Sequence, residues 1–216
     1  MERIVCLLIG YLFGMIQTSY IYGRLQGIDI REYGSGNAGT TNALRTLGKK
    51  AGLITLLGDA FKCVLAVAVV SLIYGKIHPE YIQLLRLYAA AGTILGHNFP
   101  VYLKFRGGKG IAATAGLLLS YDLRVAITAL IVFIVVFLVT HYVSLGSLVV
   151  YAVFLAGTVI LGQMGEFHME QPYLYEMYGV AVFLTVLAVF RHRENIVRLV
   201  HGNENKTFLS SKKQEK

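Results

Sequence analysis

Residues 4–23 read IVCLLIGYLFGMIQTSYIYG, a run of 20 residues that carries no charged side chain. About 20 predominantly apolar residues are needed for a helix to cross the hydrocarbon core of a bilayer. The apolar core of a signal peptide is shorter, roughly 7–15 residues, and it precedes an Ala-x-Ala cleavage site. No such site follows residue 23. We therefore expect this run to be retained as a first membrane-spanning helix.

Six more apolar runs follow, and the chain of 216 residues is 56% hydrophobic and 15% charged. Soluble domains are roughly 45–50% apolar, so the sequence predicts an all-α polytopic integral membrane protein with seven transmembrane helices. We expect residues 1–200 to form a single membrane-embedded domain and residues 201–216 to form a polar cytoplasmic tail. The fourth run would be only about 16 Å long as a helix, so it is either a short span or a helix packed among the others. The seven runs are Ile4–Gly23, Ala51–Tyr74, Tyr81–Gly96, Ile111–Tyr121, Val125–Thr140, Val143–Gly162 and Tyr173–Phe190.

The formal net charge of +8 is unevenly distributed. Residues 24–50, residues 98–110 and the chain from residue 191 hold most of the 20 lysines and arginines. Cytoplasmic loops carry such an excess of positive charge, so we expect these segments and the C-terminus in the cytoplasm and the N-terminus outside. The segment from Gln163 to Pro172 contains no Lys or Arg, which fits an outside loop. Next to membrane spans, a basic surface favours anionic lipid headgroups or a phosphorylated substrate over nucleic acid.

A first polar stretch, GSGNAGTTNALR at residues 34–45, lies between the first two apolar runs. Its glycines allow several backbone N–H groups to turn toward one point, and the hydroxyls of Ser35, Thr40 and Thr41 add further donors. Arg45 follows about one helical turn later, where its guanidinium could form a bidentate contact. The stretch indicates a site for phosphate or another oxyanion; a flexible loop of small residues is the alternative. It is not a nucleotide-binding P-loop, because Thr40 stands where that motif needs a lysine.

Two further polar stretches lie in the other basic segments. Residues 96–110, GHNFPVYLKFRGGKG, lead directly into the fourth run. A glycine loop before a helix N-terminus is a natural anion site, and Lys104 and Lys109 add positive charge. An ordinary basic loop is the alternative. Residues 191–195, RHREN, follow the last run and place His192 and Asn195 on one helix face, although basic residues after a span also serve as interface anchors.

Other polar residues leave their roles open. Asp59 and Lys62 lie three residues apart inside the second run, where they indicate either a functional group or a local ion pair. Ser144, at the start of the sixth run, could donate to a ligand or cap the helix. The two cysteines lie in apolar runs, and no Cys/His spacing indicates a zinc site. No metal or cofactor is expected.

Together the three stretches resemble the three motifs of the bacterial acyl-phosphate-dependent glycerol-3-phosphate acyltransferases, the PlsY family. The matching residues are GSGNAGTTN with Arg45, GHNFP with the later GGKG, and RHxxN at 191–195, and the resemblance extends from the first span to about Arg198. It implies transfer of an acyl group from a fatty acyl phosphate to the 1-hydroxyl of sn-glycerol 3-phosphate, the first step of phospholipid synthesis. The products are lysophosphatidic acid and phosphate, and neither coenzyme A nor acyl carrier protein takes part. A membrane transporter of organic phosphates is the alternative.

The resemblance also implies a location and roles for residues. It places the chain as a monomer among the lipids of the bacterial inner membrane, with a site that faces the cytoplasm. Ser35, Asn37 and Thr41 would hold the acyl-phosphate headgroup, and the substrate's own phosphate is favoured over His192 as the base. The residues assigned to catalysis are Ser35, Arg45, Lys104, His192 and Asn195. Those assigned to substrate binding are Asn37, Thr41, His97, Asn98, Gly107, Gly108, Lys109, Gly110 and Ser144, with Lys104 and the Gly107–Gly110 loop on glycerol 3-phosphate.

Overall fold

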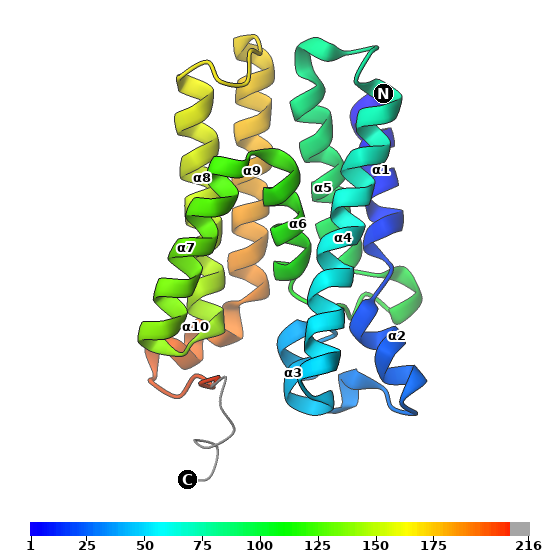
Figure 1. The fold of residues 1–216 in the computed structure, drawn as a ribbon, viewed down its shortest axis with the longest axis vertical. Helices are drawn as coiled ribbons and strands as arrows, with labels where there is room; N and C mark the ends of the chain where they lie inside the picture. Colours follow the sequence, from blue (N-terminus) through cyan, green and yellow to red (C-terminus); the bar gives the residue numbers. More distant parts are fainter. Residues whose placement is uncertain (208–216) are drawn as a thin grey trace.

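The computed structural model describes residues 1–207, and within them the chain is helical with no strand. Figure 1 shows the helices as a bundle with the N-terminus at the end opposite the last described residues. Short 3₁₀ turns lie at Ile30–Glu32, Pro79–Tyr81 and Val101–Leu103. The α-helices are α1 (Glu2–Gly14), α2 (Thr18–Leu25), α3 (Thr40–Leu47), α4 (Lys49–Tyr74), α5 (Ile82–Asn98), α6 (Ile111–Tyr121), α7 (Leu123–Thr140), α8 (Val143–Gln163), α9 (Gln171–Arg191) and α10 (Arg193–Val200).

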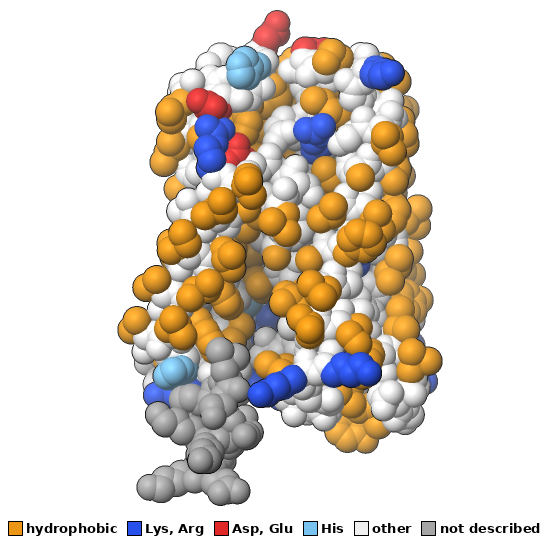
Figure 2. Space-filling model, in the orientation of Figure 1, with side chains coloured by type: hydrophobic (Ala, Val, Ile, Leu, Met, Phe, Trp, Pro, Cys, Tyr) orange, Lys and Arg blue, Asp and Glu red, His pale blue; other side chains and the backbone are white. Residues whose placement is uncertain are grey.

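Five helical segments among the described residues are long and apolar enough to cross a membrane: α1 together with α2, then α4, α7, α8 and α9. Helices α5 and α6 are shorter, with 17 and 11 residues. Apolar side chains cover the sides of the bundle, and charged side chains lie near its two ends (Figure 2). An apolar belt between two polar ends is the surface that a bilayer requires. The expected class, a helical integral membrane protein, is confirmed.

The composition of the first apolar run predicted one continuous helix. The structure instead divides this run into α1 and α2. The run is interrupted between Gly14 and Thr18, and groups far along the chain bind the carbonyls freed at the break. Ile16 O accepts a hydrogen bond from Lys62 Nζ at 2.6 Å, and Met15 O accepts one from Tyr102 Oη at 2.9 Å. A broken helix inside a membrane is stable only when such partners replace the lost backbone bonds.

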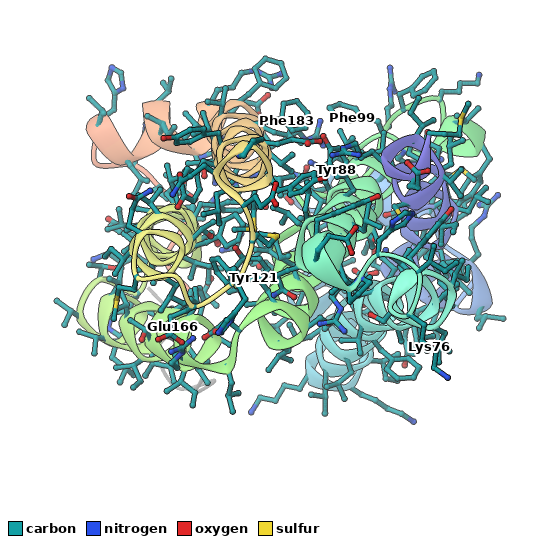
Figure 3. The ribbon with its side chains drawn as sticks, turned by 90° about the horizontal axis from the view of Figure 1, so that it is seen from above. Lys76, Tyr88, Phe99, Tyr121, Glu166 and Phe183 are labelled. Atoms are coloured by element: carbon teal, nitrogen blue, oxygen red, sulfur yellow. The ribbon has the colours of Figure 1, made fainter. Side chains whose placement is uncertain are left out.

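Helix α5 occupies the centre of one half of the bundle, between α1 and α9 (Figure 3). Glycines allow α1 and α5 to approach closely: a Cβ on Gly10 would lie 1.9 Å from Ala89 O, and one on Gly92 would lie 2.1 Å from Leu7 O. Small residues commonly mediate such helix contacts in membranes. Near the N-terminal end, Tyr88 and Arg3 both bind the Glu176 carboxylate, at 2.8 Å, which ties α5, α1 and α9 together.

The short helices α2, α3 and α10 lie at the end of the bundle opposite the N-terminus (Figure 1). The polar stretches identified in the sequence belong to this end: the first contains α3, the second connects α5 to α6, and the third connects α9 to α10. Three segments that are far apart in the chain are thereby brought to one region.

Candidate functional site

A cavity of about 380 Å³ lies where these three segments meet. Leu56, Ile111, Phe133 and Phe137 form part of an apolar wall, and polar groups from the three segments form the remainder. Ten of the residues expected from the sequence line it: Ser35, Asn37, Thr41, Arg45, His97, Lys109, Gly110, Ser144, His192 and Asn195. Four do not, namely Asn98, Lys104, Gly107 and Gly108.

The loop before α3 is folded around the buried side chain of Asn42, which the sequence analysis did not single out. Asn42 Nδ2 donates to the carbonyls of Ile30, Tyr33 and Asn37, and its Oδ1 accepts from Ser35 N at 2.9 Å. This arrangement turns the first residues of α3 toward the cavity. Thr40 and Thr41 form that first turn, where backbone N–H groups have no partner within the helix. The Thr40 hydroxyl is buried without a hydrogen-bond partner, so this wall has donors to offer an anion.

Arg45 reaches the cavity from the last turn of α3. Its guanidinium donates to Thr207 Oγ1 at 2.8 Å and to Asn205 O at 3.3 Å. Burial lowers the pKa of Arg45, but a guanidinium starts from so high a pKa that it stays charged at neutral pH. Arg45 therefore supplies a fixed positive charge beside the first turn of α3.

The second segment differs from its expected form as an amide-lined nest. Gly107 N donates to Asn98 O at 3.3 Å, and Gly108 N donates to His97 O at 3.2 Å. These two amides are thus bound to backbone carbonyls and do not form the free N–H groups that an anion nest would present. The loop instead closes back on the end of α5. The carbonyls of Gly107 and Gly108 in turn accept from Arg191, at 3.2 and 2.7 Å, which fastens the loop to α9.

Two other residues of this segment, Lys104 and Asn98, do not line the cavity. Lys104 is exposed and adopts a left-handed conformation with φ of 55° at the end of the 3₁₀ turn. The Asn98 side chain is buried, and neither its Oδ1 nor its Nδ2 has a hydrogen-bond partner. Gly108 occupies a narrow space, because a Cβ there would lie 2.3 Å from His97 Nε2 and 2.6 Å from Ala38 O. It brings the second segment against the first.

Lys109 is the cation that this loop does present to the cavity. Its ammonium donates to Asn195 Oδ1 of the third segment, and burial lowers its pKa to about 8. Lys109 is thus charged at neutral pH, although less firmly than an exposed lysine. An anion bound in the cavity would favour the charged form.

His192 and Asn195 lie on one face, as their spacing predicted, and both line the cavity. His192 Nδ1 lies 2.8 Å from Ala188 O. A carbonyl oxygen can only accept, so Nδ1 carries the proton, and Nε2 of the neutral ring is an acceptor. Burial lowers the pKa of His192 to about 4, so the ring is neutral at physiological pH.

Glu204, Asn205 and Thr207 line the cavity, although they belong to the segment for which the sequence predicted only a polar tail. The Glu204 carboxylate accepts from Arg198 Nε at 2.8 Å, from Asn195 Nδ2 at 2.7 Å and from Ser144 Oγ at 3.1 Å. Thr207 N donates to His141 O at 2.9 Å. Ser144 therefore has a protein partner and makes no capping hydrogen bond at the start of α8. The rest of the expected tail, residues 208–216, lies outside the described residues.

Asp59 also lines the cavity, although the sequence left its role open. Its carboxylate forms the local ion pair with Lys62, at 2.8 Å, and also belongs to the cavity wall. The structure thus shows the local ion pair and also places Asp59 at the cavity, where a functional role is open to it. Among residues 1–207, no group of three or more His, Cys, Asp and Glu side chains is arranged to hold a metal ion. The lining combines positive charge and donors with an apolar wall, which suits an anionic molecule with a hydrocarbon part.

Comparisons with known proteins point in the same direction. The family model described as glycerol-3-phosphate acyltransferase matches residues 4–202. The glycerol-3-phosphate acyltransferase of Bacillus subtilis (strain 168) is 40% identical over 201 residues, which cover 93% of this chain and 95% of that protein. The enzyme of the same name from Clostridioides difficile (strain 630) is 41% identical over 207 residues, 94% of each chain. A crystal structure of PlsY (YgiH), an integral membrane glycerol 3-phosphate acyltransferase, in its glycerol 3-phosphate form has a TM-score of 0.80 at 30% identity and covers 96% of both chains.

Proposed function

Because this chain belongs to the glycerol-3-phosphate acyltransferase family, as its three motifs predicted, we propose that it transfers a fatty acyl group from an acyl phosphate to the 1-hydroxyl of sn-glycerol 3-phosphate. An ester bond forms between that hydroxyl oxygen and the acyl carbon, while the bond from the acyl carbon to the phosphate oxygen breaks. The hydroxyl proton passes to the donor's phosphate. The products are lysophosphatidic acid and inorganic phosphate, and neither coenzyme A nor acyl carrier protein is used.

The observation that supports this proposal most directly is the division of the cavity into a polar and an apolar side. Arg45, Lys109 and the first turn of α3 supply positive charge and donors, while Leu56, Phe133 and Phe137 form part of the apolar wall. An acyl phosphate has the same division, a dianionic head and a hydrocarbon tail. Two phosphorylated substrates repel each other, and fixed cations and donors lower that cost while they hold the reacting atoms together.

We assign roles from the positions of these groups. Ser35, Asn37 and Thr41 lie on the α3 side and would hold the acyl-phosphate head. Lys109 and Gly110, with His97 behind them, would hold glycerol 3-phosphate in place of Lys104, Gly107 and Gly108, which lie outside the cavity lining.

Between these groups, Arg45 would contact both phosphates. Asn195 would orient Lys109 through their hydrogen bond. The neutral His192 offers Nε2 as an acceptor, but with a pKa of about 4 it is a weak base, so the donor's phosphate is the better acceptor of the proton.

We further propose seven crossings, with the N-terminus outside and the cavity and C-terminus facing the cytoplasm of a bacterial inner membrane. The crossing of α6 is supported at its far end. Gln83 at the start of α5 donates to Tyr121 O at 2.6 Å, and Arg124 pairs with Glu166 in the α8–α9 connection at 2.8 Å. These contacts join the α6–α7 connection to the start of α5 and to the α8–α9 connection, and they support the proposed crossing. We propose, as the resemblance implies, that the enzyme acts as a monomer.

The direct test is an acyl-transfer assay with the purified protein in detergent, palmitoyl phosphate and labelled glycerol 3-phosphate. We expect labelled lysophosphatidic acid and an equimolar release of phosphate. Parallel reactions with palmitoyl-coenzyme A and with palmitoyl acyl carrier protein should give no product. Product from either of those donors alone would overturn the proposed donor. Uptake of glycerol 3-phosphate into vesicles without acyl transfer would instead support a transporter.

A further inference from the structure

Three ionisable side chains form a buried cluster behind the cavity, and the roles above do not use their contacts. Asp59 and Lys62 come from α4, and His97 comes from the last turn of α5. They are 0%, 3% and 2% exposed. Asp59 and His97 line the cavity, whereas Lys62 does not. A lysine held this deeply in a membrane helix is costly unless its charge is fully compensated.

Every hydrogen on the Lys62 ammonium has an acceptor. Nζ lies 2.6 Å from Ile16 O, 2.8 Å from Asp59 Oδ1 and 2.9 Å from His97 Nδ1. An ammonium group has three donors and no lone pair, so it cannot accept from His97. Nδ1 must therefore present a lone pair to Lys62, and the proton of the neutral imidazole must lie on Nε2.

The Nε2 edge of the ring faces the loops that form the site. The nearest atom to a Cβ built on Gly108 is His97 Nε2, at 2.3 Å, and Ala38 O follows at 2.6 Å. The His97 backbone is also held, because its carbonyl accepts from Gln17 Nε2 at 3.0 Å and from Gly108 N at 3.2 Å. The ring thus has a fixed position as well as a fixed proton.

We propose that Lys62 is a positioning residue that keeps His97 neutral, with its proton on Nε2, so that the imidazole offers a hydrogen-bond donor to a phosphate in the cavity. The identity of that phosphate, glycerol 3-phosphate, rests on the proposed function. The protonation state of His97 does not.

The surrounding charges explain why Lys62 is needed for this. His97 Nδ1 lies 3.8 Å from Asp59 Oδ1, and a carboxylate at that distance favours a positively charged imidazole. Lys62 occupies Nδ1 and balances the Asp59 charge. The other charge that acts on the ring is Arg191 of α9, which also opposes its protonation. Burial of the ring acts in the same direction as Lys62, so removing Lys62 shifts the balance toward the Asp59 carboxylate, which favours a second proton at Nδ1.

Nitrogen-15 NMR of histidine-labelled, full-length protein in nanodiscs tests the protonation state without any substrate. The His97 signals are assigned by their loss in His97→Gln. We expect the wild-type spectrum to show a protonated Nε2 and an unprotonated Nδ1 that stay unchanged from pH 6 to pH 8. In Lys62→Met both nitrogens should be protonated at pH 6. Lys50→Met, an exposed lysine at the start of the same helix, should match the wild type.

A wild-type His97 that is doubly protonated, or that carries its proton on Nδ1, would overturn the proposal even if Lys62→Met fails to fold. So would an unchanged His97 spectrum in a folded Lys62→Met protein.

Steady-state kinetics test whether the N–H group at His97 Nε2 binds the phosphate of the substrate. His97→Leu removes it and should raise the KM for glycerol 3-phosphate about 10- to 100-fold, the usual effect of losing a hydrogen bond to a charged group. His97→Gln, whose amide can donate while its oxygen accepts from Lys62, should recover most of that loss. For Lys62→Met, the KM for glycerol 3-phosphate is divided by the wild-type KM at the same pH. This ratio should rise between pH 6 and pH 8.

Equal KM values for His97→Leu and His97→Gln would refute the donor role. Absence of acyl transfer by the wild type would refute the proposed function and leave the NMR result standing.

Discussion

Replacing Gly108 with alanine tests whether the contact between the first and second segments sets substrate affinity. The new Cβ would lie 2.3 Å from His97 Nε2 and 2.6 Å from Ala38 O. Non-bonded carbon contacts are favourable at about 3.5–4.0 Å, so the loop has to move by about 1 Å. It is held on both sides, by Arg191 on its carbonyls and by the His97 carbonyl on the Gly108 amide. The displacement therefore carries Lys109 and Gly110 away from the first segment.

The size of the effect follows from the strain. Overpacking by one methyl group in a constrained place costs about 1–3 kcal/mol, which corresponds to a loss of roughly 5- to 150-fold in kcat/KM at 1.4 kcal/mol per tenfold. Lys109 would contact glycerol 3-phosphate in the ground state and the transition state alike. Loss of such uniform binding raises KM more than it lowers kcat. We expect most of the loss in the KM for glycerol 3-phosphate.

The assay measures initial rates of lysophosphatidic acid formation, with glycerol 3-phosphate varied at saturating palmitoyl phosphate. Gly179→Ala is the matched control, because a Cβ at that position in α9 meets no atom within 4 Å. It should leave both constants unchanged. A Gly108→Ala enzyme whose kcat falls while its KM stays the same would remove this loop from substrate binding. An enzyme with wild-type constants would refute the steric reasoning altogether.

The remaining expectations concern charge in and near the cavity. Lys109→Met should lower kcat/KM about 10- to 100-fold, because it removes a hydrogen bond to a charged group. Lys104→Met should change kcat/KM less than about threefold. A larger loss for Lys104→Met than for Lys109→Met in steady-state assays would restore Lys104 to the site. Since the pKa of Lys109 is about 8, its charge is lost as pH rises, so kcat/KM should fall above pH 8, and Lys109→Arg should move that fall to higher pH. The second ionisation of the substrate phosphate, near pH 6, is complete below this range. His192→Gln should lower the rate but leave the shape of the profile from pH 6 to pH 8 unchanged, because the pKa of His192 is about 4; a lost acidic limb would identify His192 as the base.

The membrane helices could be predicted from apolar runs because burial in lipid is a local property of a segment. The run Ile111–Tyr121 has the same bounds as α6, and the run Val143–Gly162 differs from α8 by one residue. The break between α1 and α2 could not be predicted in this way. It contains no proline, and it is stabilised by Lys62 and Tyr102, which lie far away in the chain. A tertiary contact of this kind leaves no local signal.

Most of the residues that line the cavity could be predicted to lie together, but the hydrogen bonds between them could not. Polar residues between apolar runs indicate functional segments, and most of those identified meet at one cavity. Composition could not tell which glycine amides remain free, because that depends on the carbonyls of the neighbouring turn. Gly107 and Gly108 are bound in this way, so the second segment contributes Lys109 rather than an amide nest. Glu204 offered no signal either: it is one acidic residue in a polar tail, and its role depends on Arg198, Asn195 and Ser144.

The shortness of α6 and the depth of the cavity are two aspects of the same arrangement. Eleven residues make a helix of about 16 Å, roughly half of the hydrocarbon thickness. Tyr121, the last residue of α6, accepts a hydrogen bond from Gln83 at the start of α5, so in the proposed seven-crossing arrangement α6 begins well inside the membrane. It begins at Ile111, directly after the loop that closes back on His97 and Asn98. Non-helical backbone is tolerated at such a depth only where it is buried in protein or lines a polar cavity, and this loop does both. Extending α6 by a turn at its start would fill part of the cavity that Gly110 and Ile111 line, so we infer that the length of this helix is set by the candidate site and not by the thickness of the membrane.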